Sequence, residues 1–319
     1  SVHSSILCLG TLKKKAFAKR GRLFYSVNTE LLAMTPTKPL PPLNVPALLA
    51  RYRLQPSKGL GQNFLMDDGV LAEIVRAAGV DKTSTVLEIG PGLGSLTRRL
   101  AEEASQVIAI ELDRKMIPVL NETLKSFSNV AIVQADILAY DPSDAFAGES
   151  YCVVANIPYY ITSAVIRHLL GLRTRPSRIS LTIQKEVAER ICAGPGDFSL
   201  LSLSVRIYGE PRCMMTIGKE SFYPVPKIDS ALVRIDLYDE PLIPGNEADA
   251  FFKLIKAGFG QKRKTLRNAL ISGLALDKTA IENALSEAEI DPKRRAETLT
   301  IDEWKQLLSV LNRRSGGQL

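Results

Sequence analysis

The sequence predicts an α/β protein, with a doubly wound sheet in its larger part and a small all-helical domain at its C-terminal end. Between about residues 51 and 240, short apolar runs alternate with helical segments. The runs are apolar throughout, a pattern typical of parallel strands that helices cover on both faces. After Pro241 and Pro244 only helical patterns follow. We therefore expect a sheet domain over 51–240 and a helical domain over 241–319, after a basic, Pro-rich extension over 1–50.

The expected elements alternate in the order that a doubly wound sheet requires. The expected strands span residues 85–89, 107–110, 130–133, 151–155, 179–183 and 231–237. The helices expected in the sheet domain lie near 95–104, 114–126, 161–172 and 185–193. Those expected in the helical domain span 251–257, 266–271, 278–287 and 301–311. In such a fold, ligands bind at the edge formed by the carboxyl ends of the strands.

Composition limits the classes of protein to which the chain can belong. Of its 319 residues, 45% are hydrophobic and 24% are charged, as in ordinary globular proteins. No apolar run approaches the ~18 residues of a membrane-spanning helix, which argues against an integral membrane protein. The four cysteines lie far apart, and only two histidines are present. We therefore expect no disulfide scaffold, no metal site and a reducing compartment.

The net charge of +7 is concentrated at the N-terminal end. Residues 1–33 contain six Lys and Arg residues and one acid, Glu30, so the rest of the chain carries only +2. A polyanionic partner must then be met by a local basic patch. The basic segment is either an organellar transit peptide or a non-native extension, and we favour a natural start near Met34.

A start near Met34 predicts a cytoplasmic protein, whereas a transit peptide would direct the chain to a mitochondrion or a chloroplast. The Pro-rich stretch 36–46 is expected to form an extended linker. Neither segment contributes a predicted core.

A glycine-rich turn, Glu88-Ile89-Gly90-Pro91-Gly92-Leu93-Gly94, follows the first strong strand. Glycines there let the backbone approach a ligand, and the next helix offers free N–H groups. The dinucleotide fingerprint would need glycine at position 95, where this chain has Ser95, and a dehydrogenase is therefore not expected. The observed form resembles the motif that holds S-adenosylmethionine in class I methyltransferases, which predicts cofactor contacts at Gly90 and Gly92.

Two further acids are predicted to contact the cofactor. Glu111 ends the second strand, where a carboxylate would meet a ribose diol. Asp136 follows the third strand, where it could accept the exocyclic amine of an adenine. The alternative is that each of them is only a solvated strand end.

The sequence Asn156-Ile157-Pro158-Tyr159 follows the fourth strand. As a plain turn it would be ordinary, because Asn and Pro are common in turns. Its residue types also suit methylation of an exocyclic amine, which is a poor nucleophile because its lone pair is conjugated with the ring. The Asn156 amide oxygen and the Pro158 carbonyl can accept the two N–H protons, and Tyr159 can stack on the base.

Several further motifs resemble one family, the ribosomal RNA adenine dimethyltransferases that act on the small subunit. They are Lys58-Gly59-Leu60-Gly61-Gln62-Asn63-Phe64-Leu65, Gln184-Lys185-Glu186-Val187, Phe222-Tyr223-Pro224-Val225-Pro226-Lys227-Ile228-Asp229-Ser230 and the segment 259–270. The resemblance runs from about residue 50 to residue 311.

The resemblance implies transfer of methyl groups from S-adenosylmethionine to N6 of two adjacent adenosines. These would lie in the hairpin near the 3′ end of small-subunit rRNA. It implies cofactor contacts at Asn63, Leu65, Gly90, Glu111, Asp136 and Asn156. It implies target-base contacts at Asn156, Pro158, Tyr159 and Phe222. The implied partner is the assembling small ribosomal subunit, and we expect a monomer.

Four basic residues in the C-terminal part are predicted to bind RNA phosphates: Lys262, Arg263, Lys264 and Arg267. If this stretch is helical, apolar residues such as Phe259 and Leu266 share one face and hold the basic residues outward, although Gly258 and Gly260 can divide the helix. The alternative is an ordinary solvated face.

Two other functions stay open at this point. A macrolide-resistance-type methyltransferase that acts on large-subunit rRNA shares the Gln-Asn-Phe-Leu and Asn-Ile-Pro-Tyr motifs. A non-enzymatic relative of the transcription-factor type would use the fold only to bind nucleic acid. The acidic residues and Asn156 argue for an enzyme.

Overall fold

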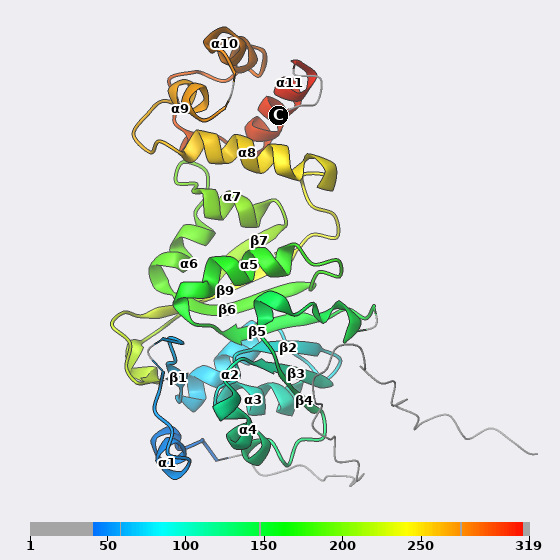
Figure 1. Ribbon diagram of the computed structural model, residues 1–319, viewed down its shortest axis with the longest axis vertical. Coiled ribbons are helices and arrows are strands. Elements are labelled where there is room, and N and C mark those ends of the chain that lie inside the picture. Colours follow the sequence, from blue (N-terminus) through cyan, green and yellow to red (C-terminus); the bar gives the residue numbers. More distant parts are fainter. Residues whose placement is uncertain (1–40, 58, 147, 275, 315–319) are drawn as a thin grey trace, which may run out of the picture.

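The computed structural model describes residues 41–57, 59–146, 148–274 and 276–314. A seven-stranded sheet forms its centre, with the strand order β4-β3-β2-β5-β6-β9-β7. The strands are β4 (Val130–Gln134), β3 (Gln106–Glu111), β2 (Thr85–Ile89), β5 (Cys152–Asn156), β6 (Arg178–Gln184), β9 (Ser230–Leu237) and β7 (Gly209–Ile217). The predicted α/β doubly wound class is confirmed. In Figure 1 the strands lie below a group of C-terminal helices.

The sheet is parallel from β4 to β6 and antiparallel at its other end, where β9 pairs with both β6 and β7. The expectation of a wholly parallel sheet is therefore wrong at β9 and β7. Chain order reverses between β2 and β5, which lie side by side in the sheet. Ligands of doubly wound folds bind at such a reversal, outside the carboxyl ends of the strands.

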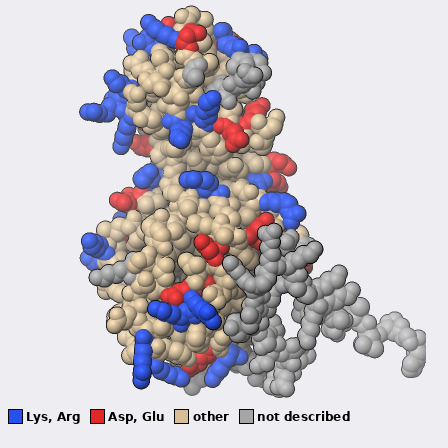
Figure 2. Space-filling view, in the orientation of Figure 1, with Lys and Arg blue, Asp and Glu red and all other residues tan. Residues whose placement is uncertain are grey.

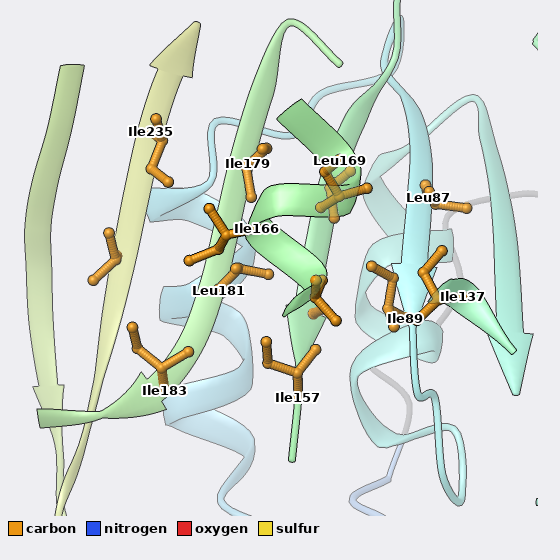
Figure 3. Packing of buried hydrophobic residues seen from close by; sticks show 14 of the residues in the cluster. Leu87, Ile89, Ile137, Ile157, Ile166, Leu169, Ile179, Leu181, Ile183 and Ile235 are labelled. Carbon is orange, nitrogen blue, oxygen red and sulfur yellow. The ribbon is translucent and has the colours of Figure 1, made fainter. Parts of the chain in front are cut away.

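Helices cover both faces of the sheet. One face packs on α2 (Asp68–Ala77) and α3 (Ser95–Glu103) through residues such as Val86, Val107 and Val154. The other face packs mainly on α5 (Thr162–Leu170) and α6 (Lys185–Cys192), and Figure 3 shows Ile166 and Leu169 of α5 against the strands. This two-sided burial explains why the strands are apolar throughout.

Helix α1 (Val45–Arg51) lies inside the range predicted as an extension. The Asn44 side chain accepts a hydrogen bond from the Ala47 N–H and caps the helix. Val45 and Leu49 are buried against Leu93 of the glycine turn and against α4 (Ile117–Thr123). The expected extended linker 36–46 is therefore wrong at its C-terminal end, because a capped helix with an apolar face begins there. The basic segment 1–33, Met34 and the rest of the linker to residue 40 lie outside the described residues.

The helical domain consists of α8 (Ala248–Phe259), α9 (Leu266–Gly273), α10 (Lys278–Glu287) and α11 (Ile301–Arg314). Its core surrounds Trp304, which is fully buried and stacks on Phe259. Three residues that precede this domain in the chain share its hydrophobic cluster: Phe198, Leu203 and Ile207, in and around α7 (Leu200–Arg206). Helix α7 thus joins the two domains.

Candidate active site

The glycine turn follows β2 directly and leads into α3. Gly90, Gly92 and Gly94 have φ values of 68°, 59° and 88°, in the left-handed region that favours glycine. A Cβ atom at Gly92 would lie 3.0 Å from the ring of Phe64, so a larger residue there would strain the turn and also collide with a neighbour. No side chain caps α3. The N–H groups of the three glycines are engaged within the protein, so the uncapped first turn of α3 is what offers backbone N–H groups to an anionic or polar ligand.

Glu111, at the end of β3, lies against this turn. Its Oε2 accepts a hydrogen bond from the Gly92 N–H at 3.0 Å, and its Oε1 accepts one from the Asp113 N–H at 2.7 Å. The side chain is only 6% exposed. Burial raises the pKa of Glu111, while the two N–H donors act against that rise. The carboxylate is therefore part of the turn and more than a solvated strand end.

Asp136 lies beside Glu111, because the Ala135 N–H donates to the Glu111 carbonyl oxygen at 3.1 Å. Its side chain is exposed, and its Oδ1 accepts from the Leu138 N–H at 3.0 Å at the start of a short 3-10 helix. The structure thus brings both predicted acids to one edge of the sheet. Their contacts with a cofactor stay predictions.

Glu88 is the first residue of the glycine motif, and the sequence analysis predicted no function for it on its own. It is 1% exposed, and its Oε2 has no hydrogen-bond partner among the described residues. Burial raises its pKa to about 8, and the carboxylate of Glu111 acts in the same direction. The site therefore contains a buried carboxyl group whose burial favours the protonated form.

Asn156, at the end of β5, is held by the motif that contains Asn63. Its Nδ2 donates to the Asn63 carbonyl oxygen at 3.1 Å, across 93 residues of sequence. The Asn63 side chain in turn donates from Nδ2 to the Gly61 carbonyl oxygen at 3.2 Å. Because the amide nitrogen of Asn156 is engaged, its Oδ1 is the atom left to accept a hydrogen bond from a substrate.

Pro158 and Tyr159 follow in a short 3-10 helix. The Pro158 carbonyl oxygen accepts from the Ile161 N–H at 3.2 Å, which leaves one lone pair for a substrate amine. The Tyr159 side chain is half-buried, and its hydroxyl lies 2.9 Å from Oγ of the fully buried Ser230. Burial raises the pKa of Tyr159. The ring is thus fixed by a residue on β9, a contact that the sequence did not predict.

Phe222 is placed differently from its predicted role. It lies on β8 (Phe222–Tyr223), which pairs with β1 (Phe64–Leu65) so that Leu65 and Phe222 are partners. Its side chain is fully buried in the cluster that contains Leu65. The expectation of an open stacking face on Phe222 is therefore not met in this structure, because core residues cover the ring. A base can stack on Phe222 only if these neighbours move.

The predicted RNA-binding residues lie at the opposite end of the molecule, around the loop between α8 and α9. Lys262, Arg263 and Lys264 are exposed in this loop, and Figure 2 shows Lys and Arg side chains gathered on this part of the helical domain. The two helices are separate, as the predicted ranges 251–257 and 266–271 require, and the three basic residues lie in the loop between them. Arg267 pairs with Glu282 at 3.0 Å and is therefore less available to a phosphate than the three loop residues.

A second basic segment, missed from the sequence, lies next to this loop. The Leu266 N–H donates to the Arg294 carbonyl oxygen at 2.7 Å, which brings the exposed Lys293 and Arg295 close to the start of α9. No sequence periodicity links these residues to Lys262–Lys264. Only the packing of the helical domain brings them together.

The described residues contain neither a metal-binding cluster nor a membrane-spanning helix. No group of three or more His, Cys, Asp or Glu side chains in that part of the chain could hold a metal ion. No helix there is long and apolar enough to cross a membrane.

Comparison with known proteins identifies the family. The model of a family described as Ribosomal RNA adenine dimethylase matches residues 54–313. The chain belongs to this family. The family is described as a dimethylase and the curated relatives are named methyltransferases, so the protein is a methyltransferase.

Two curated relatives are called Ribosomal RNA small subunit methyltransferase A. The one from Dehalococcoides mccartyi (strain CBDB1) is 46% identical over 277 residues, which cover 84% of this chain and 95% of the relative. The one from Shouchella clausii (strain KSM-K16) is 40% identical over 279 residues, which cover 85% of this chain and 94% of the relative.

Two solved structures share the fold. A dimethyladenosine transferase from Plasmodium falciparum has a TM-score of 0.69 and 25% identity, covering 79% of this chain and 98% of its own. The 23S rRNA methyltransferase ErmE has a TM-score of 0.64 and 29% identity, covering 78% and 100%. The fold is therefore that of class I S-adenosylmethionine-dependent methyltransferases with a helical C-terminal region.

Proposed function

We propose that the protein transfers methyl groups from S-adenosylmethionine to N6 of two adjacent adenosines in the 3′-terminal hairpin of small-subunit rRNA. The observation that carries this proposal is the Asn156 amide. It is fixed by the Asn63 carbonyl beside the glycine turn, and its Oδ1 is left to accept from an amine. The names of the 40–46% identical relatives support the small subunit as substrate.

The residues around the glycine turn fit S-adenosylmethionine. Gly92 lets the turn pass close to Phe64 with its N–H bound to Glu111, and Glu111 and Asp136 supply carboxylates for a ribose and an adenine amine. Asn63 and Leu65 would line the neighbouring wall. When bound, the cofactor supplies a methyl group already activated by a sulfonium centre.

The described side chains can then prepare the target amine. Asn156 Oδ1 and the Pro158 carbonyl oxygen can accept hydrogen bonds from the N–H groups of this amine and so favour a pyramidal, nucleophilic nitrogen. Tyr159 supports the base by stacking, with Ser230 holding its ring. After transfer, the surplus proton leaves to water, so no histidine or cysteine is required.

The alternative substrate is large-subunit rRNA, as named for ErmE. The small subunit is favoured because the relatives named for it are 40–46% identical, whereas ErmE is 29% identical. We further propose a monomer that needs no metal and works in the cytoplasm. A mitochondrial or chloroplast location would follow if residues 1–33 form a transit peptide.

The experiment is methyl transfer from tritiated S-adenosylmethionine to separated small and large subunits that lack adenine dimethylation. We expect label in the small subunit alone, and nuclease mapping to two adjacent dimethyladenosines near the 3′ end. Label in large-subunit rRNA would establish the alternative instead.

A further inference from the structure

A surface hollow of about 420 Å³ lies next to the base side of the site. Its walls come from the start of α6, from the 3-10 turn Lys219–Ser221 and from the loop between β8 and β9. In Figure 1 this loop, drawn in yellow-green, projects beside β1. Both motifs that form the hollow were noted in the sequence without any function for these residues.

The hollow starts one residue from the contact that fixes Tyr159. Strand pairing places Gln184 opposite Ser230, and the next pair, Lys185 and Asp229, is joined by a hydrogen bond from the Lys185 N–H to the Asp229 carbonyl oxygen at 3.1 Å. Lys185 and Asp229 both line the hollow. The hollow therefore adjoins the strand pair that holds the Tyr159 hydroxyl.

Three lysines, Lys185, Lys219 and Lys227, line the hollow and are exposed. None of them forms an ion pair with a described acid, although Glu186 and Glu189 also line the hollow. Unpaired ammonium groups are available to phosphates, while the carboxylates can accept hydrogen bonds from the amino groups of bases. Because both ammonium and carboxylate groups line the hollow, it is better matched to a nucleotide, with its phosphate and its base, than to a simple anion.

The same loop also exposes apolar side chains. Tyr223 is 37% exposed, Val225 is 59% exposed and Ile228, which lines the hollow, is 39% exposed. Apolar or aromatic faces beside cationic groups are typical of surfaces that bind single-stranded nucleic acid. The volume of the hollow falls in the ~300–1,000 Å³ range of small-ligand pockets, so it admits one nucleotide and not a duplex.

We propose that this hollow binds the RNA nucleotide next to the target adenosine, with Lys219 and Lys227 on the flanking phosphates. The inference rests on the proposed function, which requires a base displaced from a hairpin. It assigns to the loop 223–229 a role in holding the neighbouring nucleotide while the target base is in place.

The test measures binding of a hairpin RNA with two adjacent adenosines by the full chain, as a function of salt. In Lys219→Ala/Lys227→Ala, the slope of log K against log salt should fall by up to ~1.4, which is ~0.7 for each lost single-strand phosphate contact. The matched control is Lys82→Ala/Lys125→Ala, which removes the same charge from the opposite, amino edge of the sheet. Its slope should stay close to that of the wild type.

A second RNA carries uncharged methylphosphonate linkages on both sides of the target adenosine. Wild type should lose affinity for it, while Lys219→Ala/Lys227→Ala should bind both RNAs equally. Equal slopes for the two double variants, or an equal loss on the methylphosphonate RNA, would overturn the proposed subsite. If the subsite passes these tests but the wild type methylates neither adenosine, the proposed function fails and the RNA contact stands.

Discussion

The cofactor side of the site is built from the ends of three neighbouring parallel strands, whereas the base side joins segments that lie far apart in the chain. Glu111 ends β3, and Gly92 and Asp136 come shortly after β2 and β4, so each is placed by its strand. On the base side, Asn156 is held by Asn63, 93 residues away, and Tyr159 by Ser230, 71 residues away.

The residues on the two sides are therefore held in position in different ways. Strand ends of a parallel sheet meet at one edge whatever the loops do, so the cofactor side depends on local structure. The base side depends on individual long-range hydrogen bonds, each of which can be removed alone. Substitutions on the two sides should therefore separate cofactor affinity from the rate of transfer.

The largest effect is expected for Asn156→Ala. Loss of the Oδ1 acceptor should lower the rate of methyl transfer by ~10²–10³, as for other preorganised polar contacts to a reacting group. The affinity for S-adenosylmethionine should weaken only modestly. Single-turnover transfer and calorimetry on the same preparation measure both, and near-wild-type turnover by the folded variant would remove Asn156 from the mechanism.

Glu111→Ala should weaken binding of the cofactor more than it slows methyl transfer. The Kd for S-adenosylmethionine should rise about tenfold or more, because hydrogen bonds to a charged group contribute ~1.5–3 kcal/mol. Glu103→Ala, on the exposed end of α3, is the control with the same change of charge. Unchanged affinity of Glu111→Ala in titration calorimetry would mean that this carboxylate only supports the turn.

Glu88→Gln tests the buried carboxyl group through stability. In the folded protein Glu88 keeps its proton up to a pKa of about 8, while in the unfolded chain it ionises near its ordinary 4.5. The folded state therefore binds more protons in this window, and stability falls as the pH rises from 4.5 to 8.

Glutamine has no proton to lose, so the variant should gain stability relative to wild type as the pH rises. The gain between pH 6 and 7 should be about 1.4 kcal/mol, measured by urea unfolding at each pH. Exposed Glu103→Gln should show no such trend. A difference between wild type and Glu88→Gln that does not change with pH would show that Glu88 is already ionised when folded.

The smallest effect is expected for Ser230→Ala, which frees the Tyr159 ring. One lost hydrogen bond contributes ~0.5–1.5 kcal/mol, so transfer should slow roughly two- to tenfold with little change in cofactor affinity. Tyr159→Phe should give a similar loss. The double variant should be no slower than either single variant, because both remove the same bond; additive losses would mean that Ser230 acts in another way.

Most of the parallel part of the fold could be predicted, because its strands are largely apolar and all but β4 are followed by an α-helix. Strand β7 was missed because several of its residues are exposed and Pro211 interrupts its pattern. Helix α7 was missed because its seven residues are too few for a clear period. Helix α1 was missed because Pro46 suggested a linker, although proline is well suited to the first turn of a helix.

The site could be predicted at its strand ends and less well elsewhere. Glu111 and Asn156 are where the motifs placed them, beside the glycine turn. The hydrogen bond between Tyr159 and Ser230 could not be predicted from the local sequence, because it depends on the pairing of β9 with β6. The burial of Phe222 depends in the same way on the pairing of β8 with β1.

Helix α7 has a consequence for how RNA meets the enzyme. Phe198, Leu203 and Ile207 belong to the core of the helical domain, and the Gly196 N–H donates to the Glu297 carbonyl oxygen at 3.2 Å. The helical domain is therefore fastened to the sheet domain by apolar packing as well as by the chain. This packing places the basic loop between α8 and α9 relative to the Asn156 corner. We expect an RNA that contacts both to be selected by its shape as well as by its bases.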